Sequence, residues 1–180
     1  MDFQRVAEML GVGAKPSGWR GMFLPAVGVA FGIFATGSVS AWLLGGAAGL
    51  VLAASMGASA VLVFGAPAGP FSQPWPVMAG HTVSALAGCL AVRLCGPGLA
   101  AGALAVGVAM AAMTGLRCVH PPGGSTALAV VVSAMAGSSP SMGFALNPVF
   151  MNATVLVLAG SVWHRLVSGM AYPAGIRRGA

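Results

Sequence analysis

Long apolar stretches with short polar breaks between them constrain the fold of this chain more than any other feature. Five of them approach the roughly 20 residues that a helix needs to cross a bilayer. They cover residues 21–38, 41–64, 76–94, 98–116 and 148–166, and a shorter one covers residues 123–136. Only 6% of the residues are charged, against roughly 25% in soluble domains. The sequence predicts an all-α, polytopic transmembrane bundle with about five long helices.

Acidic side chains are almost absent. Asp2 and Glu8 are the two carboxylates, and none follows from residue 9 to residue 180. Cation-coupled carriers commonly bind their ion with an intramembrane Asp or Glu, and this chain offers neither. The same absence excludes carboxylate-bound metals, glycosidase pairs and carboxylate-oriented catalytic triads. We therefore expect no metal, no cofactor and no enzymatic activity.

The net charge of +6 comes from basic residues at the ends of the predicted helices. That placement is typical of anchors at a membrane surface, so we expect a lipid bilayer as partner and no nucleic acid. We expect an interfacial segment over residues 1–20, one transmembrane domain over residues 21–170 and a basic tail over residues 171–180. No signal or transit peptide is apparent, which favours a bacterial inner membrane.

The second half of the chain repeats the first. Residues 76–94 and 148–166 share nine identities in nineteen positions at an offset of 72, and residues 57–61 resemble residues 124–128 at an offset of 67. We expect repeats over about residues 41–95 and 98–167, each with a short broken or re-entrant helix followed by a Pro-initiated helix. In transporters such helices meet near the midplane. Parallel and inverted arrangements both remain open.

One polar segment breaks the apolar sequence of the second repeat. It reads His120, Pro121, Pro122, Gly123, Gly124, Ser125 and Thr126. At membrane depth, broken backbone is tolerated only where protein or a cavity surrounds it. A helix that starts here would present free N–H groups and the positive end of its dipole, which suits a small anion. We predict an anion site at this segment, with His120 tuning its charge or, alternatively, capping a carbonyl.

Other candidates come from the first repeat. The counterpart of the broken segment is Gly57, Ala58 and Ser59, which we expect to start a second short helix facing the same site. Gln73 lies in a Pro-rich loop that either folds back into a vestibule or forms a rigid surface connection. His81 has Ala153 as its repeat partner, so it is either a specialised site residue or an incidental one. Stripes of small residues favour close packing within the chain, with a homo-oligomer interface as the alternative.

The segment from His120 to Leu128 resembles the signature of the HPP family of integral membrane proteins, named for that tripeptide. Residues 57–67, followed by Gln73-Pro74 and Gly80-His81, are similar to the family's other typical stretch. Members in cyanobacteria and chloroplasts are implicated in nitrite transport, so the resemblance implies a nitrite or small-anion transporter. The family usually has a basic residue and Asn after Gln-Pro, where this chain has Trp75-Pro76.

The expected function is therefore transport of nitrite or a similar small monovalent anion. A non-transporting membrane scaffold or sensor subunit is the alternative, and it predicts that side chains seal the Pro-Pro break. An intramembrane enzyme is the weakest reading, because no carboxylate would orient His120 toward a nucleophile.

Overall fold

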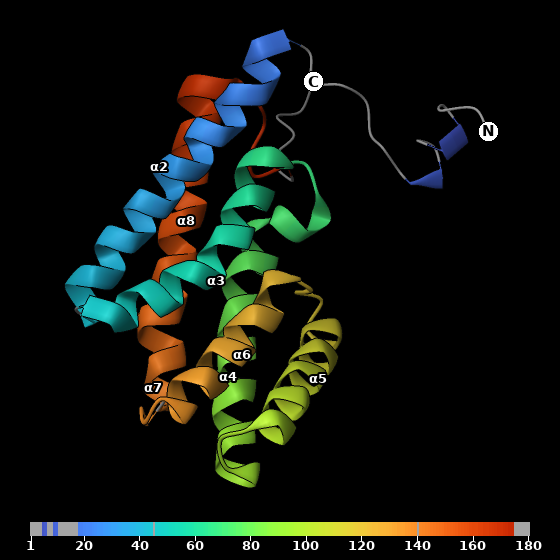
Figure 1. The fold of residues 1–180 in the computed structure, drawn as a ribbon. Helices are drawn as coiled ribbons and strands as arrows, with labels where there is room; N and C mark the ends of the chain where they lie inside the picture. The colour runs from blue at the N-terminus through green and yellow to red at the C-terminus, as the bar shows by residue number, and fades with distance from the viewer. Residues whose placement is uncertain (1–4, 7–8, 11–17, 45, 140, 175–180) are drawn as a thin grey trace.

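The computed structural model of the chain is helical (Figure 1). It describes residues 5–6, 9–10, 18–44, 46–139 and 141–174, and these residues contain no strand. The expected interfacial segment over residues 1–20 and the expected basic tail lie largely outside the described residues.

The described residues form six helices of 14 or more residues. They are α2 (Gly18–Leu44), α3 (Gly46–Gly65), α4 (Pro74–Cys95), α5 (Leu99–Gly115), α6 (Pro122–Met135) and α8 (Phe150–Trp163). A 3₁₀ turn, η1 (Pro70–Ser72), precedes α4. A short helix, α7 (Met142–Phe144), and the π-helical turns η2 (Ala145–Val149) and η3 (His164–Ser168) extend α8 at its two ends.

Three helical segments are long and apolar enough to cross a membrane by length and composition: Gly18–Leu43, Pro74–Cys95 and Met142–Ser168. The shorter apolar helices are Ser55–Gly65, Leu99–Gly115 and Pro122–Met135. The predicted all-α membrane class is confirmed, whereas the predicted count of five long membrane helices is not.

Two predicted helix starts are wrong. Gly57 lies inside α3, which runs without interruption from Gly46 to Gly65. An apolar environment offers no water to replace broken backbone hydrogen bonds, so a single glycine does not end such a helix. Pro148 lies in the π-helical turn η2 of a continuous helical segment rather than at a helix start. Proline has no N–H group to donate within the helix, and the wider π-helical turn accommodates the missing hydrogen bond.

The helices that match in sequence, α4 and α8, run in opposite directions (Figure 1). Val77, near the start of α4, packs in one cluster with Val157 and Ala159 in the second half of α8. Cys89, near the end of α4, packs with Ala145 and Val149 at the beginning of the last membrane segment. The two halves of the chain are therefore inverted relative to each other.

Two equivalent glycines make equivalent contacts across this inverted arrangement. A Cβ atom added at Gly88 of α4 would lie 2.8 Å from Cβ of Val130 on α6, and one added at Gly160 of α8 would collide with Val63 on α3. Gly88 and Gly160 are separated by the offset of 72, and the two valines by the offset of 67. Each half thus packs its long helix against the shorter helix of the other half.

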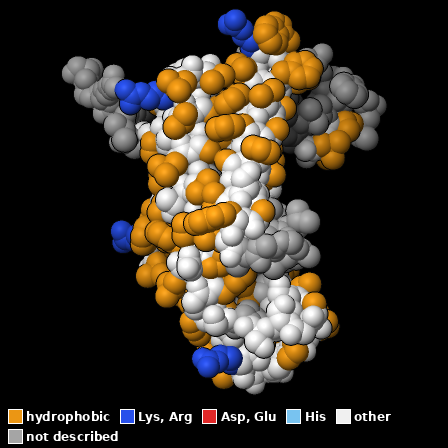
Figure 2. Space-filling model, turned by 90° about the vertical axis from the view of Figure 1, so that its left-hand side faces the viewer, with side chains coloured by type: hydrophobic (Ala, Val, Ile, Leu, Met, Phe, Trp, Pro, Cys, Tyr) orange, Lys and Arg blue, Asp and Glu red, His pale blue; other side chains and the backbone are white. Residues whose placement is uncertain are grey.

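Apolar side chains cover much of the outer surface. Figure 2 shows them along the length of the face on which α2 and α8 lie, with few basic side chains and no acidic side chain among the described residues in view. Phe34 and Trp42 of α2 are 76% and 81% exposed. Apolar exposure over a whole helical face is what a lipid environment requires and what a soluble monomer rarely shows.

Candidate functional site

The His-Pro-Pro segment lies at the tip of a helical hairpin. α5 and α6 pack side by side, and their connection, residues 116–121, lies near the middle of the long axis of the bundle (Figure 1). Arg117 adopts a positive φ of 55°, and the N–H of Cys118 donates to the carbonyl of Met113, which closes α5. Pro122 occupies the first turn of α6, where its missing N–H has no helical partner to lose.

The first N–H groups of α6 are already bonded. The N–H of Gly123 donates to the carbonyl of His120 at 2.8 Å, and the N–H of Gly124 donates to that of Pro121 at 3.1 Å. Pro121 is itself helical (φ −52°, ψ −39°), so the chain turns before α6 begins. The prediction of free N–H groups at Gly123 and Gly124 is therefore wrong in this conformation. Pro121 and Pro122 have no N–H to offer either.

Two glycines let the hairpin tip touch α4. A Cβ atom added at Gly80 would lie 2.7 Å from Cβ of His120 and 2.9 Å from the carbonyl oxygen of Cys118. One added at Gly123 would lie 2.5 Å from Oγ of Ser84. All three separations are shorter than ordinary van der Waals contacts, so the hairpin tip and α4 meet this closely only because these two residues lack side chains. The contact brings His120 against the helix that carries His81.

Four polar side chains form one buried hydrogen-bonded network, called here the two-histidine network. Oγ of Ser59 on α3 lies 2.7 Å from Nε2 of His81 and 2.8 Å from Nε2 of His120. Nδ1 of His81 lies 2.6 Å from Oγ1 of Thr126 on α6, and Nδ1 of His120 lies 2.7 Å from the carbonyl oxygen of Phe71. None of the four side chains is more than 1% exposed.

The carbonyl of Phe71 fixes the direction of every bond in the network. A carbonyl only accepts, so Nδ1 of His120 carries a proton, and Nε2 of the neutral ring accepts from the Ser59 hydroxyl. Ser59 has no second proton, so Nε2–H of His81 donates to Ser59, and Nδ1 of His81 accepts from Thr126. With both rings neutral, each ring nitrogen and each hydroxyl proton of the network therefore has a partner, the carbonyl of Phe71 included.

The network joins the two repeats. Ser59 and Thr126 are equivalent at the offset of 67, and both bond to the same imidazole, that of His81. The counterpart of His81 in the second repeat is Ala153, so this imidazole is present in one half only. The ring centroids of His81 and His120 lie 4.8 Å apart. Two hydroxyls at equivalent positions thus bond to a pair of imidazoles that meet edge to face and break the symmetry.

Several predicted site residues lie apart from this network. Gln73 donates to the carbonyls of Pro67 and Gly69 and accepts from the N–H of Ala174, so its contacts fit a rigid connection rather than a vestibule. Ala58 is exposed and Gly57 partly exposed, one and two positions before Ser59 on α3. Ser125 is exposed and donates to the carbonyl of Pro122 in its own turn.

Sequence reasoning missed a second buried polar contact. Nδ2 of Asn152 on α8 donates to Oγ of Ser40 on α2 at 2.7 Å, and both side chains are fully buried. Oδ1 of Asn152 has no hydrogen-bond partner among the described residues. Single polar residues in apolar helices form no motif, so only the repeat, which aligns Asn152 with Gly80, could have drawn attention to this position. The described residues contain no group of three His, Cys, Asp or Glu side chains placed to hold a metal ion.

Comparison with known proteins agrees with this architecture. The sequence pattern of the family described as "HPP, transmembrane region" matches residues 14–173. A transmembrane protein of Dictyostelium discoideum is 44% identical over 90 residues, which are 47% of this chain and 29% of that protein. A second one from the same organism is 33% identical over 127 residues, 68% of this chain and 44% of that protein.

The chain spans less than half the length of either relative, and both are named only as transmembrane proteins. No solved structure matches it. The family match covers the apolar helices, the inverted halves and the His-Pro-Pro segment at the hairpin tip. The chain is a multi-pass membrane protein that belongs to the HPP family.

Proposed function

We propose that this protein transports nitrite or a similar small monovalent anion, and that the anion passes through the two-histidine network. The observation that carries the proposal is the network itself: four buried polar side chains in an apolar bundle, at the place where the two inverted repeats meet. Polar and ionisable groups at membrane depth are costly and mark transport pathways by default. Inverted repeats around a central site are the usual architecture of carriers.

The chemistry of the network favours an anion over a cation. The described residues contain no carboxylate, whereas Ser59, Thr126 and the two imidazoles supply O–H and N–H donors. An anion entering between the rings would take over the hydroxyl protons that now bond to imidazole nitrogens. In the present conformation these groups bond to one another, which corresponds to a closed state. Binding has to remain modest, because a transported ion must also be released.

We place the protein in a bacterial inner membrane, acting on its anion without enzymatic chemistry. The Dictyostelium relatives belong to a eukaryote, so the family as a whole is not confined to bacteria. The bilayer itself is the expected environment, as the exposed apolar faces require.

One observation favours a second function, that of a non-transporting scaffold or sensor subunit. The Pro-Pro break is closed by side chains: His120, Pro122 and Thr126 are all buried. A scaffold needs nothing more than this closed arrangement. It predicts that variants of the network change stability without any anion flux to lose.

Nitrite uptake into proteoliposomes separates the two functions. Thr126→Val keeps the shape of the side chain and removes the hydroxyl that donates to His81. Losing one hydrogen bond to a charged partner costs roughly 1.5–3 kcal/mol, so we expect anion affinity to fall about 10- to 100-fold. Thr154→Val is the matched control, because Thr154 is a partly exposed helical threonine that bonds to its own turn. Absence of uptake by the unmodified protein would favour the scaffold.

Uptake is also expected to depend on pH through His120. Adding a proton to this imidazole places a positive charge in the site, so uptake by the unmodified protein should rise as the pH falls from about 8 to about 5.5, most steeply at the acidic end, because burial disfavours the charged imidazole. His120→Gln should flatten this dependence, whereas His164→Gln, at a buried histidine bonded to Val63 and Ser168, should keep it. Protein-free liposomes correct for leakage of nitrous acid. An unchanged pH profile in His120→Gln would contradict a role for His120 in setting site charge.

A further inference from the structure

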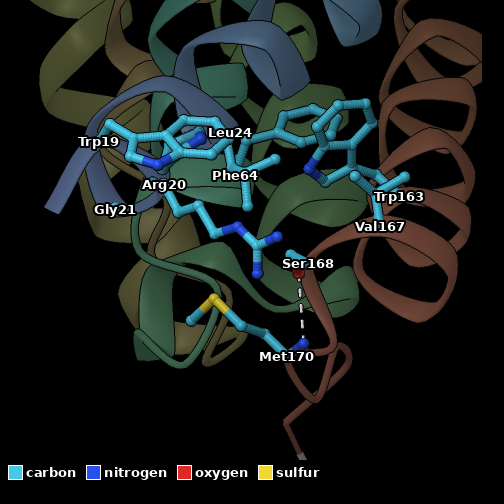
Figure 3. Close-up of a pocket in the computed structure, with 11 residues that line it drawn as sticks. Trp19, Arg20, Gly21, Leu24, Phe64, Trp163, Val167, Ser168 and Met170 are labelled. Carbon is cyan, nitrogen blue, oxygen red and sulfur yellow. Dashed lines mark hydrogen bonds between the residues drawn. The ribbon is translucent and has the colours of Figure 1, made fainter. Parts of the chain in front are cut away.

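A separate cavity lies at the end of the bundle where α2 begins and where α3 and α8 end. Its volume is about 780 Å³. Figure 3 shows Trp19, Arg20 and Leu24 of α2 on one side, Phe64 of α3 at the back and Trp163 with Val167 on the other side. This volume is within the range of about 300–1,000 Å³ typical of small-molecule sites. None of these residues belongs to the two-histidine network.

Among the described residues that line the cavity, one is a cation, Arg20, and none is acidic. The guanidinium of Arg20 points into the space between Phe64 and Ser168 (Figure 3). Its one interaction within the described part of the chain is with the ring of Trp19, at 5.6 Å. The residues described by the structure include no Asp or Glu, so no acidic side chain among them can neutralise it. An arginine presents five N–H donors in a fork that matches phosphate oxygens.

A second donor of the cavity wall also lacks a partner. Nε1 of Trp163 is buried and makes no hydrogen bond within the described residues. The polar groups on the opposite wall are occupied, since Ser168 bonds to His164 and accepts the N–H of Met170, the bond dashed in Figure 3. Because that Nε1 is enclosed against Gly28 of α2, the side-chain donor that a ligand in the cavity can reach is Arg20, which calls for a ligand with acceptor oxygens.

Most of the remaining wall is apolar. Leu24, Phe64, Trp163 and Val167 line it, and they would contribute little to a free inorganic anion. They suit a ligand that carries an apolar chain behind its anionic head. The cavity opens where transmembrane helices end, which is the level at which lipid headgroups lie and at which Trp and Arg gather.

We infer that this cavity binds an acidic phospholipid. The phosphate of the headgroup lies against the guanidinium of Arg20, and the first part of an acyl chain lies along Leu24, Phe64 and Trp163. The site is independent of the proposed anion pathway, so a protein that transports no anion could still bind the lipid. Bound in this way, the lipid joins the start of α2 to the ends of α3 and α8.

Native mass spectrometry of the purified protein tests this inference. The protein is incubated with equal amounts of phosphatidylglycerol and phosphatidylcholine that carry the same acyl chains. We expect retention of phosphatidylglycerol and a loss of about tenfold or more in its affinity in Arg20→Gln, as charge-assisted hydrogen bonds are removed. Arg93→Gln removes an exposed cation in the last turn of α4, which does not line the cavity. This variant should bind the lipid like the unmodified protein.

Crosslinking locates the lipid and separates it from a soluble anion. A phosphatidylglycerol with a photoreactive group near the start of its acyl chain should label peptides around Leu24 and Val167. Labelling confined to other helices would overturn the proposal, as would equal retention of both lipids. Displacement of the lipid by millimolar inorganic phosphate would also overturn it, because the site would then recognise the anion alone. An unchanged preference for phosphatidylglycerol in Arg20→Gln would have the same meaning.

Discussion

Replacing Gly80 by alanine is expected to destabilise the protein strongly, although the change adds only one methyl group. That methyl would lie 2.7 Å from Cβ of His120 and 2.9 Å from the carbonyl oxygen of Cys118. Neither atom is the end of a flexible side chain, so the hairpin tip has to move away from α4. Overpacking of this kind costs about 1–3 kcal/mol, occasionally more. Here the displacement would also pull His120 away from Ser59, 2.8 Å distant.

The matched control is Gly124→Ala, in the His-Pro-Pro segment whose His120 faces Gly80. A Cβ atom at Gly124 would meet only Cγ1 of Val106, at 3.8 Å, which is an ordinary contact. Alanine is also favoured over glycine inside a helix by roughly 0.5–1 kcal/mol. We therefore expect thermal unfolding in detergent to shift downward in Gly80→Ala and to stay level or rise in Gly124→Ala. Equal unfolding temperatures for the two variants would mean that the close contact at Gly80 does not position the tip.

Much of the fold follows from physical constraints that are local in sequence. The length of the apolar stretches and the scarcity of charge predict membrane helices, because a bilayer demands both. The repeat offset connects Ser59 with Thr126 without any structural information, and the structure places both on His81. The relative orientation of the two repeats could not be predicted from the sequence, because it depends on how α4 packs on α8 in space.

The predictions from sequence are wrong where the conformation of the neighbouring backbone decides whether a helix starts and whether its N–H groups are free. Glycines at Gly57 and Gly123 look alike in sequence, yet the first lies in the continuous helix α3 and the second in the first turn of a new helix. The difference comes from Pro121 and Pro122, which end the preceding hydrogen-bond pattern. The predicted anion site at free N–H groups is wrong because Pro121 is helical. The carbonyls of His120 and Pro121 therefore accept the hydrogen bonds of the Gly123 and Gly124 N–H groups. Nothing in the sequence indicates that the backbone carbonyl of Phe71 accepts a hydrogen bond from His120.

Ser59→Ala is expected to be the most damaging single change in the network. The Ser59 hydroxyl is the one group that bonds to both imidazoles, so its removal leaves Nε2 of His120 without a donor and Nε2–H of His81 without an acceptor. Each unsatisfied buried group costs about 1–3 kcal/mol. Thr126→Val leaves only Nδ1 of His81 unpaired and should cost less. Ser38→Ala, at an exposed serine bonded to its own turn, should have little effect.

The two changes should not add. Once Ser59 is replaced, the ring of His81 is held only through Thr126, and it is free to turn toward other partners when that bond is lost as well. Residues that share a network show coupling energies of about 0.5–3 kcal/mol, so the double variant should be less destabilised than the sum of the single variants. Chemical unfolding of the four proteins in one detergent measures this coupling. Strict additivity would mean that Ser59 and Thr126 act independently, and the shared imidazole of His81 would then not be the element that joins the two repeats.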